Sequence, residues 1–438
     1  MRKLMNMLIS SKFFFIAIML IYKVLIDLSY VYIISPNYAY AGLYLKISSL
    51  KLMESYLLLF IFLLILKHRI NKPSEFFILF LFSLLAVPIL SIYSLQDKSR
   101  DFLCMVMLSF LTIIIVSKFP QIKIPILNNG RKAAIFISVI TGIFVFSWII
   151  SHGGLSYLNF NLLKVYDFRS IVAEMVFPGR MSYLVSWFGK VINPLMISFS
   201  LWKKNKVMVF ITIGMQVLFY AITAHKSMLF YPFLVIFVYI FGRKKYFGQM
   251  VPLGLAGVTA VSSFIYIIAN SIIPISYFVR RTLFVVADLH YKYFDTFKEL
   301  GYIYLSDRAW FPKIIEYPFD IPIPQVISYI YQGHTETWAN TGFLATGYMN
   351  FGFAGMLIYS FIVGIIFRFI DYIAKWYLPG WLCIAIMITP IFSLTNADLA
   401  TALITHGILL ALLMLWLISS GSKRCSTGEN NRLRKETN

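Results

Sequence analysis

The run HTETWAN (334–340) leads directly into TGFLATGYMNFGFAGM (341–356), and this junction indicates how the chain is built. The first part is polar and aromatic, and it places His334, Glu336 and Trp338 within five residues. The second part is apolar and rich in glycine, which is typical of a membrane helix that packs closely against a neighbour. The junction therefore predicts a polar segment at the threshold of a membrane span.

The glycines of this span favour close helix packing. At about 100° per residue, Gly347, Gly352 and Gly355 fall within an arc of roughly 140°, whereas Gly342 points elsewhere. Small residues on one face let two helices approach each other. We expect the three glycines to face a neighbouring helix.

Apolar runs of similar length recur along the whole chain. Hydrophobic residues make up 60% of its 438 residues and charged residues only 13%, whereas soluble domains carry about 25% charged residues. A helix needs roughly 20 apolar residues to cross a bilayer. The first run, 13–34, lacks a small-residue cleavage site, so we expect a span and not a cleaved signal peptide. The sequence predicts an all-α polytopic integral membrane protein, a single transmembrane domain over 1–438, with about twelve spans near 11–34, 48–66, 75–95, 102–117, 133–151, 183–201, 207–224, 227–241, 250–273, 341–367, 378–395 and 399–419.

The net charge of +21 is a topology signal. Lysines and arginines gather in alternate short loops, for example in 67–72, 203–206 and 243–245. Cytoplasmic loops carry such an excess, so both termini, including the basic tail 420–438, should be cytoplasmic. This placement does not indicate a nucleic-acid partner. The three cysteines, Cys104, Cys383 and Cys425, have no spacing that predicts disulfides or a metal site.

Two outward segments, 152–182 and 274–340, are longer than the other loops. A loop as long as the second is usually functional or disordered, and its many aromatic residues argue against disorder. In its first part an apolar stripe at helical spacing predicts an amphipathic helix lying on or under the outer headgroups. That stripe consists of Leu283, Phe284, Ala287, Tyr291 and Phe294. The stretch 311–325 holds four prolines, which block long helices, so an ordered, irregular cap is expected there.

Arginines on the outer face are candidate anion-binding residues. The positive-inside bias disfavours them there, yet Arg169, Arg180, Arg280, Arg281 and Arg308 all fall in outward segments. The planar guanidinium group suits phosphate oxygens and keeps its charge. The alternative is that acidic neighbours satisfy them. The large loop, 274–340, carries six basic and seven acidic residues, so the loop as a whole has no positive charge that would attract anions.

Histidines are candidates for proton transfer. His334 stands beside Glu336 and Trp338, and an imidazole can accept a proton from a sugar hydroxyl near neutral pH. The alternative is an interfacial histidine bonded to backbone. His152, His225 and His290 also fall in outward segments, His406 falls just inside the last span, and Lys226 could meet a phosphate in its tight turn.

Other charged residues and several absences narrow the possibilities. Lys23 and Asp27 lie four residues apart within the first span and should neutralise each other, with a proton relay as the alternative. The first outer loop, 35–49, contains no carboxylate, which disfavours a glycosyltransferase that uses a divalent metal. The chain has no phosphate-cradling glycine loop and no clustered metal ligands, so any energy for chemistry must arrive within the substrate.

The order of these parts resembles a known family. The matching features are a middle outer loop ending in PGR (178–180), the turn AHKS (224–227), the stretch RRTLFVVADLHYKYFDTF (280–297), and a large outer loop leading into NTGFLATGYMNFGFAG (340–355). In this layout the chain is similar to the bacterial O-antigen and capsular polysaccharide polymerases (Wzy, oligosaccharide repeat-unit polymerases).

The resemblance implies a membrane glycosyltransferase fold of the GT-C-like kind, shared with O-antigen ligases, in the bacterial inner (plasma) membrane. It implies transfer of a growing chain from undecaprenyl pyrophosphate to the non-reducing end of a new lipid-linked repeat unit, without metal or other cofactor. Its partners would be that lipid-linked oligosaccharide, membrane lipid, and a chain-length regulator and flippase of the same pathway. The alternatives are an O-antigen ligase and, in a different class, a lipid-linked oligosaccharide flippase; a channel or scaffold without enzymatic activity is a further one.

A diphosphate leaving group needs cationic stabilisation at the outer face. We therefore expect Arg180 and Arg280 to be catalytic. The resemblance adds His334, because the related ligases have a histidine a little upstream of an Asn- and Gly-rich helix; here His334 lies six residues before Asn340. Binding of the diphosphate or of sugars is expected for Arg281, Lys226, Arg169, Tyr291, Trp338 and Asn340.

Overall fold

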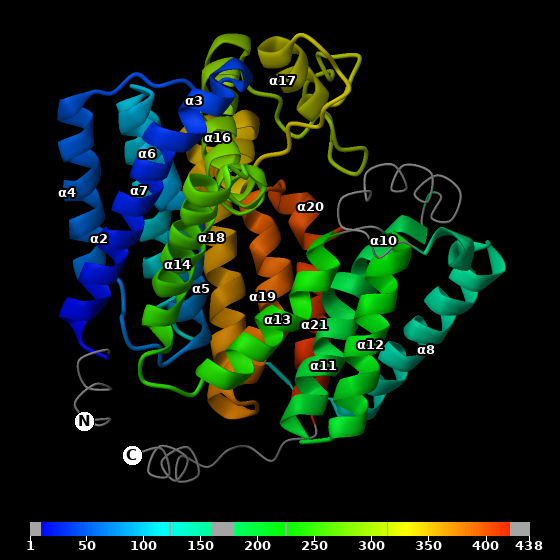
Figure 1. The fold of residues 1–438 in the computed structure, drawn as a ribbon. Helices are drawn as coiled ribbons and strands as arrows, with labels where there is room; N and C mark the ends of the chain where they lie inside the picture. Colours follow the sequence, from blue (N-terminus) through cyan, green and yellow to red (C-terminus); the bar gives the residue numbers. More distant parts are fainter. Residues whose placement is uncertain are drawn as a thin grey trace. The chain divides into compact units, whose positions relative to one another are not determined.

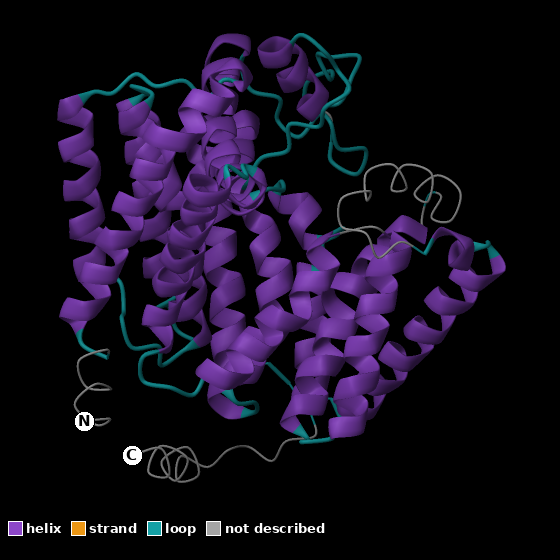
Figure 2. Cartoon of the chain, in the orientation of Figure 1, coloured by secondary structure: helices purple, strands orange, loops and turns teal. Residues whose placement is uncertain are grey.

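The computed structural model describes residues 10–121, 124–125, 127–158, 179, 181–223, 226–312 and 314–420. Figures 1 and 2 show that this part of the chain is built from helices and loops, without strands. Eight helices are long and apolar enough to cross a membrane: Lys12–Ala41, Pro73–Leu95, Gly130–Ser151, Met181–Trp202, Lys206–Thr223, Phe247–Ala269, Phe343–Trp376 and Leu399–Ser419. The expectation of an all-helical, polytopic membrane protein is confirmed. The number of twelve spans and their orientation stay predictions.

The chain divides into two compact units, each assembled from separate parts of the sequence. Unit 1 comprises Met1–Phe119, Lys244–Phe367 and Leu394–Leu399, and unit 2 comprises Pro120–Arg243, Arg368–Ser393 and Ala400–Asn438. Each unit is described by itself below.

Unit 1 is a bundle in which the first and ninth predicted spans, α2 and α14, pack along each other. Its helices are α2 (Lys12–Ser29), α3 (Ser35–Tyr38), α4 (Ser49–Ile65), α5 (Pro73–Leu81), α6 (Val87–Leu95), α7 (Arg100–Val116), α14 (Phe247–Ala269), α15 (Ile273–Ile275), α16 (Val285–Leu300), α17 (Ile323–Gln332) and most of α18 (Phe343–Trp376). Three wider π-helical turns interrupt it: η1 (Tyr30–Ile34), η3 (Phe82–Ala86) and η6 (Ser276–Phe284); a short 3₁₀ turn, η2 (Ala39–Ala41), follows α3.

Helix α18 contains a break that the glycine pattern did not predict. Phe351 and Gly352 have non-helical backbone angles, and Gly352 has a φ of +62°. A Cβ atom on Gly347 would lie 2.9 Å from the carbonyl oxygen of Gly355. In a continuous helix these two residues would lie about 12 Å apart along the axis. The glycines do permit a close approach of backbone, as predicted. The approach is within α18, where Gly347 and Gly355 face each other across the break, and not to a neighbouring helix.

The predicted amphipathic helix is present, but its expected position on the surface is wrong. Helix α16 is buried on nearly all sides, and the five residues of the apolar stripe are each no more than 2% exposed. It packs on α6 and α17, and Phe102 of α7 lies against Phe294, with 5.0 Å between ring centroids. The helical spacing predicted the buried apolar face of α16 correctly. It could not predict that the polar face is buried too, because the elements that cover that face are far away in the sequence.

The expected irregular cap is present. Residues 301–322 form turns and loops, and the four prolines of 311–325 precede or begin the short helix α17. This helix ends at Gly333, whose φ of +76° allows the chain to reverse. Figure 1 shows α17 beside the upper part of α16. Tyr331 of α17 donates a hydrogen bond to the backbone oxygen of Lys292, at 3.3 Å, and ties the cap to α16.

The expected charge pair in the first span is confirmed. Lys23 Nζ lies 2.5 Å from Asp27 Oδ2, and the Lys23 side chain is fully buried. Tyr56 donates a second hydrogen bond to the same carboxylate oxygen, at 2.9 Å. A buried ion pair needs such additional bonds to offset desolvation.

Unit 2 is a second helical bundle with a polar centre. Gln216 donates to the backbone oxygens of Gly189 and Met228, at 2.9 and 3.1 Å, and accepts a hydrogen bond from Asn193. Gly189 lies in the π-helical turn Phe188–Ile192, and Met228 lies four residues before Pro232, which has no N–H to donate to it. The elements are α8 (Gly130–Ser151), η4 (Gly154–Tyr157), α10 (Met181–Trp187), η5 (Phe188–Ile192), α11 (Asn193–Trp202), α12 (Lys206–Thr223), α13 (Lys226–Phe241), α19 (Gly380–Phe392), most of α20 (Leu399–Leu403) and α21 (Ile408–Ser419). The 3₁₀ turn η7 (Ser393–Thr395), between α19 and α20, belongs to unit 1 except for Ser393.

Candidate functional site

The arginine pair Arg280–Arg281 lies on the π-helix η6. Such helices are rare, usually span a single turn, and are often found at functional sites. Thr282 donates to the backbone oxygen of Tyr277, five residues earlier, at 3.1 Å, which suits the wider turn. Phe284 packs on Tyr30 of η1 with 4.8 Å between ring centroids, and η6 also contacts η3. Three wide turns of unit 1 therefore meet beside the arginine pair.

Arg280 is held by an aromatic ring and a hydroxyl. Its guanidinium carbon lies 4.1 Å from the ring centroid of Tyr38, and its Nε donates to Ser276 Oγ at 3.1 Å. Among the residues that the structure describes, no carboxylate forms an ion pair with it. The side chain is half-buried, and Arg281 beside it is exposed. An arginine fixed in this way keeps donors available for an anion.

The Tyr38 ring comes from the first predicted outer loop. Its neighbour Asn37 donates to Ile33 O at 2.7 Å and to the hydroxyl of Tyr266 in α14 at 3.1 Å. These two bonds fix the turn that carries Tyr38. No local sequence pattern pointed to Tyr38, because its contact with Arg280 joins segments more than 200 positions apart.

Arg308, by contrast, is occupied by acids. Its Nη2 lies 2.9 Å from Asp398 Oδ2, and its Nε lies 3.1 Å from Asp307 Oδ2. Burial raises the pKa of the Asp307 carboxyl, and the arginine opposes that shift. For this arginine the alternative expected from the sequence, satisfaction by acidic neighbours, is confirmed.

Helix α16 carries buried ionisable groups next to the arginine pair in sequence. Asp288 and Lys292 form an ion pair of 2.8 Å with side chains 4% and 8% exposed. Burial raises the pKa of Asp288, and the Lys292 ammonium opposes the shift. Such a pair stabilises the fold only while both partners are present.

His290, on the same helix, is fully buried. Its Nδ1 lies 2.7 Å from the backbone oxygen of Val286 and 3.0 Å from Thr341 Oγ1. A carbonyl oxygen can only accept, so Nδ1 carries the proton and Nε2 keeps a lone pair. Burial lowers the pKa of His290 to about 4, so the ring is neutral at neutral pH. Nε2 has no partner in the described part of the chain.

Sequence reasoning gave His290 little weight, although a signal was present. His290 lies three residues after Ala287 and four before Phe294, on the apolar stripe itself. The segment that opens α18 docks there, because Tyr293 also donates to the backbone oxygen of Ala339 at 3.0 Å. The histidine that touches the start of α18 is therefore His290.

His334, Trp338 and Asn340 lie on the exposed segment between α17 and α18, and Trp338 is 56% exposed. Within the described residues, no hydrogen bond or ion pair joins these three to Arg280. Their accessibility suits contact with a substrate, but the structure does not bring them together with the arginine pair.

The remaining predicted site residues have different outcomes. The Tyr291 side chain, expected to bind diphosphate or sugar, is fully buried, and its ring packs edge-on against Phe102 at 5.0 Å. Its binding role stays a prediction. Lys226 is the first residue of α13 in unit 2. Arg169 and Arg180 lie outside the described residues.

Two further histidines have partners in unit 2. His152 stacks on Trp148, with 3.9 Å between ring centroids. His406 Nδ1 lies 2.5 Å from Lys190 Nζ. His225 lies outside the described residues. Among the residues that are described, no group of three or more His, Cys, Asp or Glu side chains is placed to hold a metal ion.

Comparisons of this chain with protein-family models, with curated proteins and with solved structures found no match.

Proposed function

We propose that this chain is a membrane glycosyltransferase that polymerises oligosaccharide repeat units carried on undecaprenyl pyrophosphate. The observation that carries the proposal is the state of Arg280: half-buried, lying on the Tyr38 ring, and without a carboxylate partner in the described residues. The sequence layout, with a large aromatic segment next to this arginine, gives further support.

In the proposed reaction the sugar–phosphate bond of the donor breaks while an acceptor hydroxyl attacks the sugar carbon. Arg280, with Arg281 beside it, would donate N–H groups to the diphosphate oxygens as their charge develops. The acceptor hydroxyl would lose its proton to a base. His334 is our proposed base because it is exposed, and Trp338 and Asn340 would contact sugars nearby. Arg180, Arg169 and Lys226 stay candidates for phosphate contacts.

The test compares variants in a two-substrate assay with purified protein and defined lipid-linked oligosaccharides. Removing one preorganised donor costs about 100- to 1,000-fold in rate, so Arg280→Ala should lose polymer to that extent and Arg280→Lys should recover part of it. Arg100→Lys is the matched control, because Arg100 is exposed and paired with Glu54 at 2.6 Å. Wild-type chain lengths from Arg280→Ala would remove this arginine from the mechanism.

The same assay separates the base candidates. His334→Ala should abolish transfer while His290→Ala leaves the transfer rate of the folded fraction unchanged. The reverse result would assign the proton transfer to His290. Transfer to a lipid A core acceptor, with no addition of a second repeat unit, would identify a ligase instead.

A second candidate function, a lipid-linked oligosaccharide flippase, is favoured by the break in α18. Discontinuous helices often form the substrate sites of transporters. Here, however, two backbone oxygens beside the break already have partners, because Met349 and Asn350 accept from the backbone nitrogens of Ile303 and Tyr304 at 3.1 and 3.2 Å. Movement of a labelled lipid across vesicles without any transfer would favour the flippase.

A further inference from the structure

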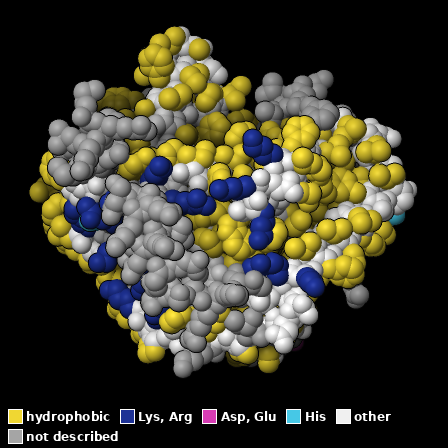
Figure 3. All heavy atoms as spheres, turned by 90° about the horizontal axis from the view of Figure 1, so that it is seen from below, with side chains coloured by type: hydrophobic (Ala, Val, Ile, Leu, Met, Phe, Trp, Pro, Cys, Tyr) yellow, Lys and Arg dark blue, Asp and Glu magenta, His cyan; other side chains and the backbone are white. Residues whose placement is uncertain are grey.

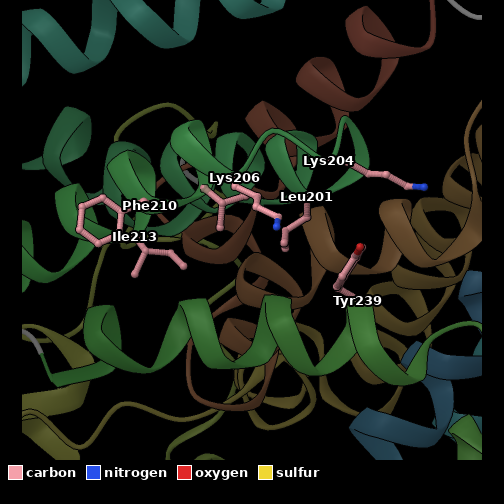
Figure 4. Close-up of a pocket in the computed structure, with 7 residues that line it drawn as sticks. Leu201, Lys204, Lys206, Phe210, Ile213 and Tyr239 are labelled. Carbon is pink, nitrogen blue, oxygen red and sulfur yellow. The ribbon is translucent and has the colours of Figure 1, made fainter.

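Unit 2 contains a cavity of about 450 Å³ at the turn between α11 and α12. That volume lies within the usual range of ligand sites, roughly 300 to 1,000 Å³. Its lining comes from the end of α11, the start of α12 and one residue of α13, as Figure 4 shows. The lining residues are Leu201, Lys204, Lys206, Val209, Phe210, Ile213 and Tyr239.

The cavity has an apolar body and a cationic rim. In Figure 4 the Lys206 side chain bends toward Leu201, the Tyr239 hydroxyl points toward the same space, and Lys204 extends outward. Both lysines are exposed. Arg243 adds a third cation, since its guanidinium carbon lies 5.8 Å from the Tyr239 ring centroid.

No acid of the described part of unit 2 neutralises this rim. The one carboxylate there is Asp371, and it lies 3.9 Å from Arg368. The turn itself is well defined: Lys204 has a φ of +56°, and Asn205 accepts a hydrogen bond from the backbone nitrogen of Met208 at 3.1 Å. The two lysines therefore lie on either side of a capped turn, without a carboxylate partner among the described residues of unit 2.

The position of the cavity matches the level of lipid headgroups. It lies where two membrane-spanning helices, Met181–Trp202 and Lys206–Thr223, end and begin. Phe210 is 81% exposed and Val207 68%, which places bare apolar surface next to the lysines. Trp202 carries Lys203 over its ring at 4.8 Å, an arrangement typical of a membrane interface. Figure 3 shows the same alternation of lysine and arginine side chains with hydrophobic ones on the face seen from below.

We propose that this cavity binds an anionic phospholipid of the bilayer. The headgroup phosphate lies between Lys204 and Lys206, and one acyl chain runs along Leu201, Val209, Phe210 and Ile213. Basic pockets between membrane helices bind anionic headgroups in this way. A soluble anion would use the lysines but would leave the apolar lining exposed to water. The inference rests on unit 2 alone and is independent of the proposed transfer reaction.

The test measures the dissociation constant of the first bound lipid on the purified full chain by native mass spectrometry. The probe is phosphatidylglycerol, and phosphatidylcholine with identical acyl chains is the reference. Each lysine near a charged lipid contributes enough that the double variant Lys204→Gln/Lys206→Gln should bind phosphatidylglycerol about thirtyfold more weakly. The matched control is Lys132→Gln/Lys375→Gln, which removes the same charge from exposed positions of unit 2 outside the cavity.

A filled cavity provides the second measurement. Ile213→Trp keeps both lysines and occupies the space of the acyl chain, so it should also abolish the preference for phosphatidylglycerol over phosphatidylcholine. Equal losses in the two lysine double variants would overturn the proposal, because they would show general charge attraction. Displacement of the lipid by inorganic phosphate would overturn it in favour of a soluble anion. Tighter binding of undecaprenyl phosphate than of phosphatidylglycerol would overturn it in favour of a pathway lipid.

Discussion

The two units of this chain treat their charges differently. In unit 1, five groups of cations are paired with carboxylates: Lys23 with Asp27, Lys46 and Lys51 with Asp97, Arg100 with Glu54, Lys292 with Asp288, and Arg308 with Asp307 and Asp398. In the described part of unit 2, one carboxylate, Asp371, accompanies ten lysines and arginines: Arg131, Lys132, Lys190, Lys203, Lys204, Lys206, Lys226, Arg243, Arg368 and Lys375.

Aromatic rings replace carboxylates in unit 2. Arg131 and Lys203 lie over Trp202, Arg243 lies over Trp381, and distances to the ring centroids are 5.3, 4.8 and 4.9 Å. A ring attracts a cation without neutralising it. Among the described residues, six lysines and arginines of unit 1 lie within 3.1 Å of a carboxylate oxygen, whereas in unit 2 Arg368 lies 3.9 Å from Asp371. In unit 1, Arg280 also lies over a ring, as do Lys12, Lys98 and Lys298. The proposed function rests on Arg280 because its planar guanidinium group suits phosphate oxygens.

The largest expected effect concerns a backbone contact of unit 1. Gly355→Ala should lower the free energy of unfolding by about 4 kcal/mol or prevent folding, because the added methyl group meets the backbone of Gly347 and neither can move aside. The free energy is measured by SDS titration in mixed micelles. Gly214→Ala in unit 2 is the control: nothing lies within 4 Å of its added Cβ, and alanine stabilises a helix by up to about 1 kcal/mol. Equal stabilities of the two variants would contradict the described break in α18.

A smaller effect tests the pairing of charges directly. Arg308→Met should cost about 3 kcal/mol, because it leaves Asp398, 8% exposed, without its cation. Arg243→Met in unit 2 removes a cation from aromatic rings and should cost about 1 kcal/mol or less. The same unfolding titration compares them. The double variant Arg308→Met/Asp398→Leu should recover most of the loss, and a double variant as unstable as the single one would show that charge pairing is not the cause.

The smallest effect is the pH dependence that His290 contributes in unit 1. The pKa of His290 is about 4 in the folded chain and about 6.5 when unfolded. Between these pH values the unfolded state therefore binds more protons than the folded state. The contribution of His290 to the stability of the folded chain is complete above pH 6.5 and is lost as the pH falls toward 4. Between pH 7 and pH 5 the loss should be about 2 kcal/mol.

Asp288 requires a control in this experiment, because burial raises its pKa and the pH dependence of its stability contribution has the opposite sign. We therefore compare wild type with His290→Gln at each pH. The difference between their unfolding free energies should shrink by the stated amount on acidification. A difference that does not change with pH would show that His290 takes up its proton without cost in the folded chain.

Much of the secondary structure could be predicted from the sequence, because apolar runs of membrane length and helical spacing are local properties. A helix lies in each of the twelve predicted ranges, the 311–325 prolines interrupt helix as expected, and Lys23 meets Asp27 one turn away. The break at Gly352 escaped prediction, because the angular argument for its glycines assumed a continuous helix. The burial of α16 on nearly all sides also escaped prediction, because a stripe of apolar residues shows which face is buried, but not that the opposite face is covered too.

The candidate site was harder to predict from the sequence than the secondary structure, because the contacts of its residues depend on the tertiary structure. The outer arginines could be found by their types and positions, yet the sequence treated Arg280 and Arg308 alike. Only the folded chain separates them, because Asp398 and Tyr38, which decide their states, lie 90 and 242 positions away in the sequence. By itself, the sequence determined a helical membrane protein with cations at its loop ends, since hydropathy and charge are read residue by residue. Which cations are neutralised and which stay available was decided by the tertiary structure, since electrostatic pairing depends on distance in space.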